Sequence, residues 1–361
     1  MISEQCLENE WVEHLRASNT SLQKVDPGQL EVAIRALDVL CRLKKYGVPF
    51  LFKGGTSLLL HLPEFRRLSV DVDIVCTVSK AEFEEVLTEI VENGPYEEWK
   101  EDERGANRLP KRRHYNLYYP THRTPTKRQR VVVDVLEKPC PITDLVEKPV
   151  TTRFLEVEEE VRVRLPSVNA LLGDKLTAFA PHTVGVKLTE ATAQQVAKQM
   201  FDVGELFLAA DDFQAVKNAY RENQAAEASY HEEPPTFEES LKDTREAAYE
   251  FCHHGLKKDP NRNPEDRALL LKGIGQMQGL LVGTRFNTVE ARIHAARAAR
   301  AADAILQDLS FKMDALHYLS ERDLEQLRDW RFSPEHAVLQ RLRAQPEALY
   351  HWKHILGGID G

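Results

Sequence analysis

The chain has 361 residues, of which 42% are apolar and 29% charged, the balance of a globular protein and not of a disordered or fibrous one. No apolar run approaches the ~20 residues that span a bilayer, and the N-terminus lacks a secretory signal pattern, so we predict a cytoplasmic protein with no membrane partner. The net charge of −9 excludes a scaffold that binds nucleic acid over its whole surface, but it allows a local basic patch.

The first half of the chain predicts a mixed sheet with helices. Apolar residues recur at helical spacing over residues 27–46 and 80–93. Short strands are expected at 48–52, 68–75, 115–119 and 130–136. Alternation over 151–165 predicts one or two further strands at the edge of the sheet. Five scattered cysteines, none in a C-x-x-C pair, indicate buried free thiols.

The second half is helical almost throughout. The clearest helical runs cover residues 238–252, 266–281 and 289–309. A chain of this length commonly forms two domains. The predicted fold is therefore α+β, with a mixed-sheet domain over residues 1–165 and an all-helical domain over residues 166–361.

Three acidic residues lie in or beside predicted strands. Asp71 and Asp73 are two positions apart, so on a strand both carboxylates point to the same face. Asp134 lies among the apolar residues of VVVDVL and is expected on a neighbouring strand. Carboxylate oxygens are the ligands that Mg²⁺ prefers, so these three residues are candidate metal ligands. The alternative, strand-end acids that face water, is equally common for a D-x-D pattern taken alone.

A glycine pair precedes these acids. Gly54 and Gly55 follow a predicted strand and come before a predicted helix, where backbone N–H groups can approach a phosphate. Thr56 and Ser57 add hydroxyl groups. A glycine pair alone is usually just a turn, but a D-x-D strand at this interval makes a phosphate loop the stronger interpretation.

Together these motifs resemble a known family. Residues 53–58 (KGGTSL) followed by residues 67–73 (RLSVDVD) are similar to the first two motifs of the AbiEii/AbiGii-type nucleotidyltransferase toxins, which include the MenT toxins. That family is a branch of the DNA polymerase β-like superfamily. Residues 171–178 (LLGDKLTA) and 198–206 (KQMFDVGEL) resemble the third and fourth motifs, although Gln199 follows Lys198 where the family usually has an acid. The likeness covers residues 51–206.

The resemblance implies a polymerase β-like nucleotidyltransferase fold and a Mg²⁺-dependent transfer, with Mn²⁺ as a possible substitute. It implies Asp71, Asp73, Lys175 and Asp202 as catalytic residues. The implied contacts to the NTP are Lys53, Gly54, Gly55, Thr56, Ser57, Arg67, Ser69 and Lys175. The helical domain would thus contribute Lys175 and Asp202 to the active-site cleft.

Each of these roles has a plainer alternative. Lys175 suits the β- and γ-phosphates as a point charge, but a surface lysine is common on any helix. Asp202 suits a base or a partner that orients Lys175, but it could be a surface acid paired with Lys198 one turn earlier. Arg67 could contact the triphosphate or brace the carboxylates.

Residues 111–130 form a basic run with no acidic residue. It includes Arg112, Arg113, Arg123, Lys127 and Arg128, which we predict to bind RNA phosphates. Tyr115, Tyr118 and Tyr119 are interleaved and suit stacking on bases. The alternative is a solvated hairpin tip.

The resemblance implies the 3′ end of tRNA as the acceptor, a consequent block of translation, and a cognate antitoxin as partner. Two other functions stay open: transfer to a small molecule or protein, and a non-catalytic protein that senses NTP. The basic run favours RNA over a small molecule, and the complete set of acids disfavours the non-catalytic alternative.

Overall fold

The computed structural model describes residues 1–102, 110–253, 264–309 and 319–357. The chain divides into two compact units. Unit 1 comprises Met1–Pro166 and Gly279–Thr284, and unit 2 comprises Ser167–Gln278 and Arg285–Gly361. The predicted single boundary between residues 165 and 166 does not account for the return of Gly279–Thr284 to unit 1.

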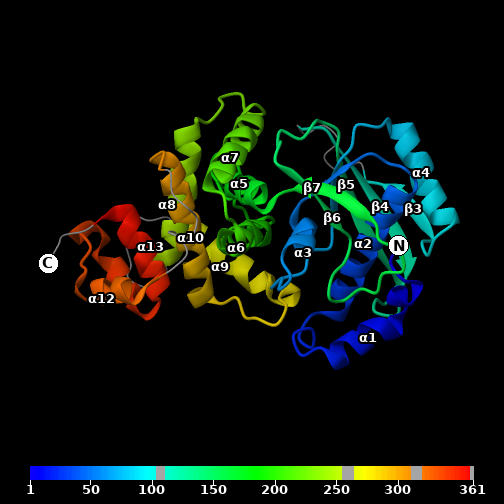
Figure 1. The fold of residues 1–361 in the computed structure, drawn as a ribbon, viewed down its shortest axis with the longest axis horizontal. Coiled ribbons are helices and arrows are strands. Elements are labelled where there is room, and N and C mark those ends of the chain that lie inside the picture. The colour runs from blue at the N-terminus through cyan, green and yellow to red at the C-terminus, as the bar shows by residue number, and fades with distance from the viewer. Residues whose placement is uncertain (103–109, 254–263, 310–318, 358–361) are drawn as a thin grey trace. The chain divides into compact units, whose positions relative to one another are not determined.

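Unit 1 is built on a five-stranded mixed sheet in the order β1-β2-β5-β4-β3. Figure 1 labels β3, β4 and β5 of this sheet. Strands β2 and β5 are parallel, and the other neighbours are antiparallel. The strands are β1 (Leu51–Lys53), β2 (Val72–Val75), β3 (Glu98–Glu101), β4 (Arg112–Pro120) and β5 (Arg128–Leu136). The sheet and the helices of both units confirm the predicted α+β class.

Helices α2 (Pro27–Lys45) and α4 (Lys80–Glu92) cover one face of this sheet. The Arg35 guanidinium of α2 lies 4.7 Å from the ring centre of Tyr119 on β4, and Arg113 of β4 lies 5.6 Å from the ring centre of Phe83 on α4. The side chains of β5 that face these helices are apolar and buried. Alternation therefore sends the polar residues of β5 to the opposite face. The other helices of unit 1 are η1 (Glu4–Leu7), α1 (Asn9–Ser18), η2 (Gly55–Ser57) and α3 (Leu58–His61).

Strands β6 (Leu145–Pro149) and β7 (Arg162–Pro166) form a separate two-stranded antiparallel sheet. The prediction that residues 151–165 extend the edge of the main sheet is therefore wrong. Alternation reveals the period of a strand but not its partner, and here the partner is residues 145–149. The edge strands of the main sheet are instead β1 and β3. The sequence analysis did not predict β3.

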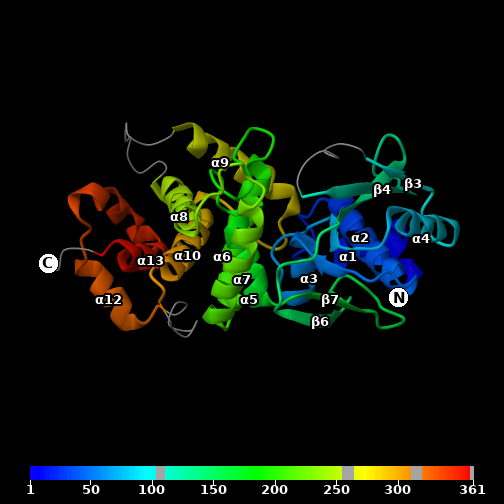
Figure 2. The same cartoon turned by 90° about the horizontal axis from the view of Figure 1, so that it is seen from above.

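The regular elements of unit 2 are all helices in the residues that the structure describes (Figure 2). The predicted helices at 238–252 and 289–309 are confirmed, whereas the one predicted at 266–281 ends at Gln276 and is followed by a short turn of 3-10 helix. The helices after β7 are α5 (Val168–Ala178), α6 (Ala193–Ala209), α7 (Phe213–Ala228), α8 (Phe237–His253), α9 (Pro264–Gln276), η3 (Gln278–Leu280), α10 (Thr288–Leu306), α12 (Glu321–Asp329), η4 (Pro334–Ala344) and α13 (Pro346–Leu356).

Two glycines let helices of unit 2 pack closely. A Cβ on Gly173 of α5 would lie 2.6 Å from the backbone nitrogen of Tyr220 on α7. A Cβ on Gly204 of α6 would lie 2.0 Å from Cδ2 of His294 on α10. These contacts hold α5 and α6, the helices that carry Lys175 and Asp202, against their neighbours.

The five cysteines are free, as predicted, and all but Cys140 are buried. No helix in the described ranges combines the length and the hydropathy of a membrane span.

Candidate active site

The turn after β1 has a backbone conformation that glycine adopts far more readily than other residues. Gly54 has φ +74° and ψ −169°. A Cβ on Gly54 would lie 1.9 Å from Oδ2 of Asp73, and a Cβ on Gly55 would lie 2.8 Å from Oγ of Ser69. The two glycines therefore let the turn touch the segment that carries the predicted acids.

The predicted helix after this turn is short. A 3-10 turn, Gly55–Ser57, leads into the four residues of α3. A helix this short has little macrodipole. The backbone N–H groups of the turn are therefore the main groups that could bind an anion here.

Thr56 and Ser57 serve the turn itself. Oγ1 of Thr56 donates a 2.5 Å hydrogen bond to the carbonyl of Asp71, and Oγ of Ser57 donates a 2.7 Å bond to the carbonyl of Gly54. Both side chains are fully buried. Their predicted contacts to the NTP stay predictions, and the observed bonds fix the turn against the residue that precedes β2.

Four polar side chains cross the sheet in one row, on the face opposite α2 and α4. Lys53 is the Cα partner of Asp73, Asp73 of Asp134, and Asp134 of His114. Residues paired across neighbouring strands point to the same face. All four are part-exposed, whereas the residues on either side of them in β2, β4 and β5 are buried. We call these four residues the polar row.

His114 is the member of the polar row that the sequence analysis assigned elsewhere. Its Nδ1 lies 2.6 Å from Oδ1 of Asp134. The sequence placed His114 in the basic run, because the register of the β4–β5 hairpin is not visible in residue order. The contact orients the Asp134 carboxylate through Oδ1. The other carboxylate oxygen, Oδ2, takes no part in this contact.

The carboxylates of the polar row suit Mg²⁺ without forming a closed cage. Among the described residues, no group of three or more His, Cys, Asp or Glu side chains is arranged to hold an ion. Mg²⁺ is often held by one or two carboxylates, substrate phosphates and waters. Asp73 and Asp134, on adjacent parallel strands, fit such a site. Asp71 lies just before β2, and its place in the predicted set of three ligands stays a prediction.

Arg67 and Ser69 lie beside the glycine turn and are buried. Nη2 of Arg67 is 2.9 Å from the position that a Cβ on Gly55 would take, and its Nη1 donates a 2.9 Å hydrogen bond to the carbonyl of Leu68. Arg67 also forms an isolated β-bridge with Leu281, in the segment that returns to unit 1. Arg67 thus braces this region, while its contact to the triphosphate stays a prediction.

Lys175 and Asp202 form a buried ion pair within unit 2. Nζ of Lys175 lies 3.3 Å from Oδ2 of Asp202 and donates a 3.0 Å hydrogen bond to Oε1 of Gln199. Lys175 is 5% exposed and Asp202 is 0% exposed. The alternatives of a surface lysine and a surface acid are therefore wrong. Gln199, the departure from the family pattern, is a direct partner of Lys175.

The basic run is not one basic surface. Alternation along β4 turns Arg113, Tyr115 and Tyr119 toward the core, where all three are buried. Arg113 pairs with Glu137 at 2.7 Å. The expectation that Tyr115 and Tyr119 stack on bases, and that Arg113 presents its charge to RNA, is therefore wrong for this structure.

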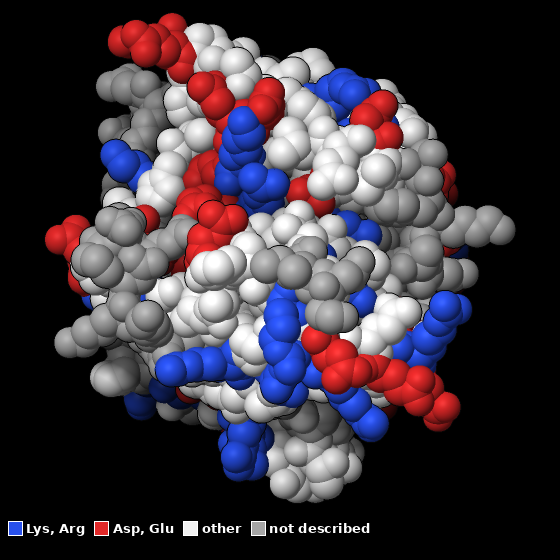
Figure 3. Space-filling model, turned by 90° about the vertical axis from the view of Figure 1, so that its left-hand side faces the viewer, with Lys and Arg blue, Asp and Glu red and all other residues white. Residues whose placement is uncertain are grey.

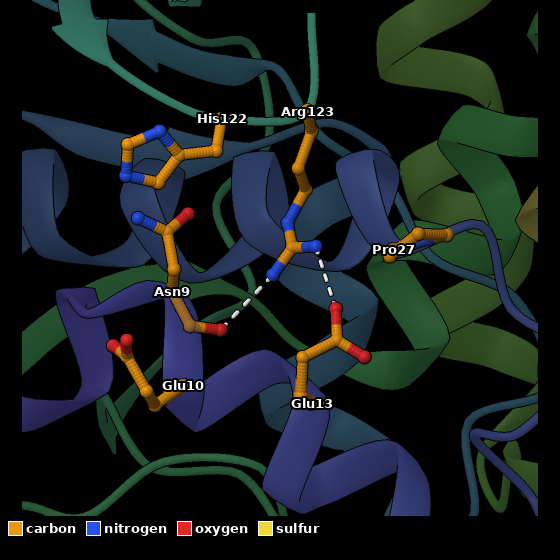
Figure 4. Close-up of a pocket in the computed structure, with 6 residues that line it drawn as sticks. All are labelled: Asn9, Glu10, Glu13, Pro27, His122 and Arg123. Carbon is orange, nitrogen blue, oxygen red and sulfur yellow. Dashed lines mark hydrogen bonds and ion pairs between the residues drawn. The ribbon is translucent and has the colours of Figure 1, made fainter.

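Arg123 and Arg128 are engaged within unit 1. Arg123 lines a pocket of about 460 Å³, where it donates to the carbonyl of Asn9 at 3.0 Å and pairs with Glu13 at 2.7 Å (Figure 4). Arg128 pairs with Glu97 at 3.1 Å and lies 4.2 Å from the ring centre of Tyr118.

Arg112 and Lys127 are the exposed members of the predicted RNA-binding set. Arg112 begins β4, two residues before His114 and on the same face, so it lies near the polar row. Lys127 lies beyond the far end of β4, roughly 25 Å away along the strand at the usual rise per residue. Residue order therefore grouped two charges that the hairpin separates.

Comparison with known proteins gives the family of the chain. The model of the nucleotidyl transferase AbiEii toxin family, of type IV toxin–antitoxin systems, matches residues 38–270. This match spans more than half of the chain and includes the glycine turn, the polar row, Lys175 and Asp202. The site and the match together define a nucleotidyltransferase. The chain belongs to the AbiEii family of nucleotidyltransferase toxins.

Two solved structures show a weaker likeness. MenT4, a nucleotidyltransferase toxin of Mycobacterium tuberculosis, is 14% identical, with a TM-score of 0.48 over 95% of this chain and 98% of that one. An inferred nucleotidyltransferase of H. pylori is also 14% identical, with a TM-score of 0.43 over 83% of this chain and 99% of that one. No curated protein matches the chain.

Proposed function

We propose that this protein transfers a nucleotide from an NTP to the 3′ end of tRNA, with Mg²⁺ or Mn²⁺ as cofactor, and so blocks translation. One observation carries the proposal: the register places Asp73 beside Asp134 and directly against Gly54. Two carboxylates can hold the metal ion of a metal–triphosphate complex, and the adjacent glycine turn can bind its phosphates. Membership of a nucleotidyltransferase toxin family supports the same reaction.

The reaction moves one phosphoryl centre between two oxygens. The 3′-hydroxyl oxygen attacks the α-phosphorus, the bond from that phosphorus to the bridging oxygen breaks, and pyrophosphate leaves. When bound, Mg²⁺ neutralises charge on the phosphates and on the attacking oxygen. In this proposal Asp73 and Asp134 hold the ion, Asp71 completes the acidic set, and backbone N–H groups at Gly54 and Gly55 bind phosphate.

We assign the remaining predicted roles on chemical grounds. Lys53 and Lys175 supply positive charge to the triphosphate, and Asp202 orients Lys175. Asp202 is also the candidate acceptor of the proton of the attacking hydroxyl. Arg67 and Ser69 act by holding the glycine turn.

Arg112 is the residue we propose to guide the RNA end to the polar row. It is exposed and near His114, while Arg113 is buried and Arg123 and Arg128 have acidic partners. Arg112→Ala should therefore reduce RNA labelling while leaving NTP binding unchanged. Lys127→Ala, which removes an exposed charge at the other end of β4, is the matched control. Equal effects of the two variants would contradict this assignment.

The decisive experiment incubates the protein with total tRNA, Mg²⁺ and each α-labelled NTP in turn. We expect labelled, 3′-extended tRNA on a denaturing gel. Asp73→Asn should abolish the label, and so should periodate oxidation of the tRNA, because it destroys the terminal diol. Label that resists RNase would favour a protein or small-molecule acceptor, and label-free RNA with all four NTPs would overturn the proposal.

A toxin of this activity needs control in its own cell, so we propose a cognate antitoxin as a second partner. Co-expression with the neighbouring gene should restore growth of cells that make this protein. If Asp71→Ala proves as growth-inhibitory as the parent, the protein acts by sensing NTP and not by catalysis.

A further inference from the structure

The C-terminal elements of unit 2 lie beyond the family match, which ends at residue 270. Among them, α12, η4 and α13 enclose a groove of about 370 Å³. Its lining is formed by Leu324, Leu327, Arg328, Arg343, Pro346 and Leu349. Four of these six lining residues are apolar, and the other two are arginines.

The apolar lining of the groove reaches solvent at Leu324. Its side chain is 39% exposed, one of few large apolar side chains in the described chain with such exposure. Leu327 and Leu349, which also line the groove, are buried. An exposed leucine over a groove is typical of a surface that an apolar side chain of a partner covers.

Three arginines meet at the C-terminal end of α12. Nη1 of Arg331 and Nη2 of Arg343 donate to the carbonyl of Arg328, at 3.1 and 3.3 Å. This carbonyl lies in the last turn of α12, where basic groups commonly bind. Capping uses one nitrogen of each donor and leaves most of the five N–H groups of each guanidinium for other acceptors.

None of these three arginines has an acidic partner among the residues that the structure describes. All three are exposed. Figure 3, which looks onto this end of unit 2, shows many Lys and Arg side chains across the lower half of the face, with a group of Asp and Glu side chains at its lower right. Neighbouring like charges repel one another, and a partner with carboxylates would relieve that repulsion.

We propose that this groove binds an acidic amphipathic helix of a protein partner. Leucine-type side chains of the helix enter the groove beside Leu324, and its carboxylates pair with Arg328, Arg331 and Arg343. RNA would match the charges but would leave the apolar groove unused, so the geometry favours a peptide. The proposal is independent of the catalytic reaction, since none of these residues belongs to the candidate active site.

A peptide titration tests the proposal. The probe is a fluorescein-labelled peptide with leucine at every third or fourth position and glutamate at most others, and its control is the same composition with the leucine spacing scrambled. Fluorescence anisotropy should show saturable binding of the probe to the full chain. The scrambled peptide should bind at least roughly tenfold more weakly.

Surface variants locate the binding. Leu324→Glu, and Arg328→Glu together with Arg343→Glu, should each weaken binding by roughly tenfold or more. Arg322→Glu, an exposed charge reversal on the same helix outside the groove, should leave it within about twofold. Circular dichroism checks that each variant stays folded, which is expected because Leu324 and the arginines are exposed.

Three outcomes of these measurements would overturn the proposal: no saturable binding of the probe, equal binding of the scrambled peptide, or a loss of binding in Arg322→Glu as large as in the groove variants. A fourth would be a single-stranded RNA oligonucleotide that binds more tightly than the probe and loses its binding in the Arg328→Glu, Arg343→Glu variant. Sedimentation of the parent and of Leu324→Glu completes the test. A dimer that only the parent forms would assign the groove to a second copy of the chain.

Discussion

Asp73 lies against the α-carbon of Gly54, and Asp134 is bonded to His114, so each paired carboxylate of the polar row is held by a neighbour. Such support matters because metal and phosphate sites tolerate little misplacement of their ligands. The supporting atoms come from a turn and from another strand. A single substitution there can therefore displace a carboxylate without removing it.

Gly54→Ala should disable the site. The new methyl group would overlap the Asp73 carboxylate at 1.9 Å, and the positive φ adds a cost of about 1 kcal/mol. Gly47→Ala is the matched control, because Gly47 has a similar φ of +79° with nothing within 4 Å of its built Cβ. We expect loss of nucleotide transfer in the first variant and near-parental transfer in the second. Similar activity in both would show that the contact with Asp73 is unimportant.

His114→Leu should weaken metal binding because Asp134 loses the bond that orients it. Loss of a group that orients a ligand commonly costs 10–100-fold in metal affinity. His114→Gln retains a donor and should lose much less. Mn²⁺ titration followed by electron paramagnetic resonance, without NTP, measures this directly. Parental affinity in His114→Leu would rule out a positioning role for His114.

At the scale of elements, several short pieces of unit 1 are held by distant partners. His61, the last residue of α3, has its Nε2 2.9 Å from the carbonyl of Pro166 at the end of β7. Gly279–Thr284 attaches through the bridge between Leu281 and Arg67. Because α3 has only four residues, its stability depends on such contacts and not on helix propensity.

The burial of His61 should make stability pH-dependent. Burial lowers the pKa of His61 to about 4 from an ordinary 6.5, although its bond to Pro166 opposes this shift. Between these values the unfolded chain binds the proton and the folded chain does not, so the free energy of unfolding falls as pH drops from 6.5 to 4. The loss attributable to this group is roughly 2–3 kcal/mol.

Denaturant titrations across this pH window measure the effect. His61→Gln should show a shallower decline of stability than the parent, because it removes the titrating group. His231→Gln removes an exposed histidine of unit 2 and should decline as the parent does. An unchanged slope in His61→Gln would assign the acid sensitivity to other groups.

At the scale of the whole molecule, the predicted machinery is divided between the two units. The polar row belongs to unit 1, and Lys175 and Asp202 belong to unit 2. The family match includes both sets. A chain ending at Pro166 would also lack the partner of Arg67, because Leu281 comes later in the sequence. We therefore expect transfer activity only from a chain that contains both units.

The ion pair in unit 2 allows catalytic and structural roles to be separated. Lys175→Met alone should destabilise unit 2 by roughly 3–5 kcal/mol, because it leaves the fully buried Asp202 without this cation. Adding Asp202→Leu removes the buried charge and should restore most of that stability. Thermal unfolding and tRNA labelling are measured for both variants. The double variant should be stable but inactive, and recovery of its activity would exclude both residues from catalysis.

The sequence by itself determined many helices and strands and the family of this protein, because these are encoded in local patterns. Helical spacing predicted α2 and α4, apolar runs predicted strands where β2 and β5 lie, and the KGGTSL and D-x-D motifs identified the family. Only the tertiary structure decided which strands pair and in what register. That register brought His114 to Asp134, buried Arg113 and Tyr119, and set Arg112 far from Lys127. Pairing and register depend on contacts between distant segments, whereas a local pattern specifies only its own period and face.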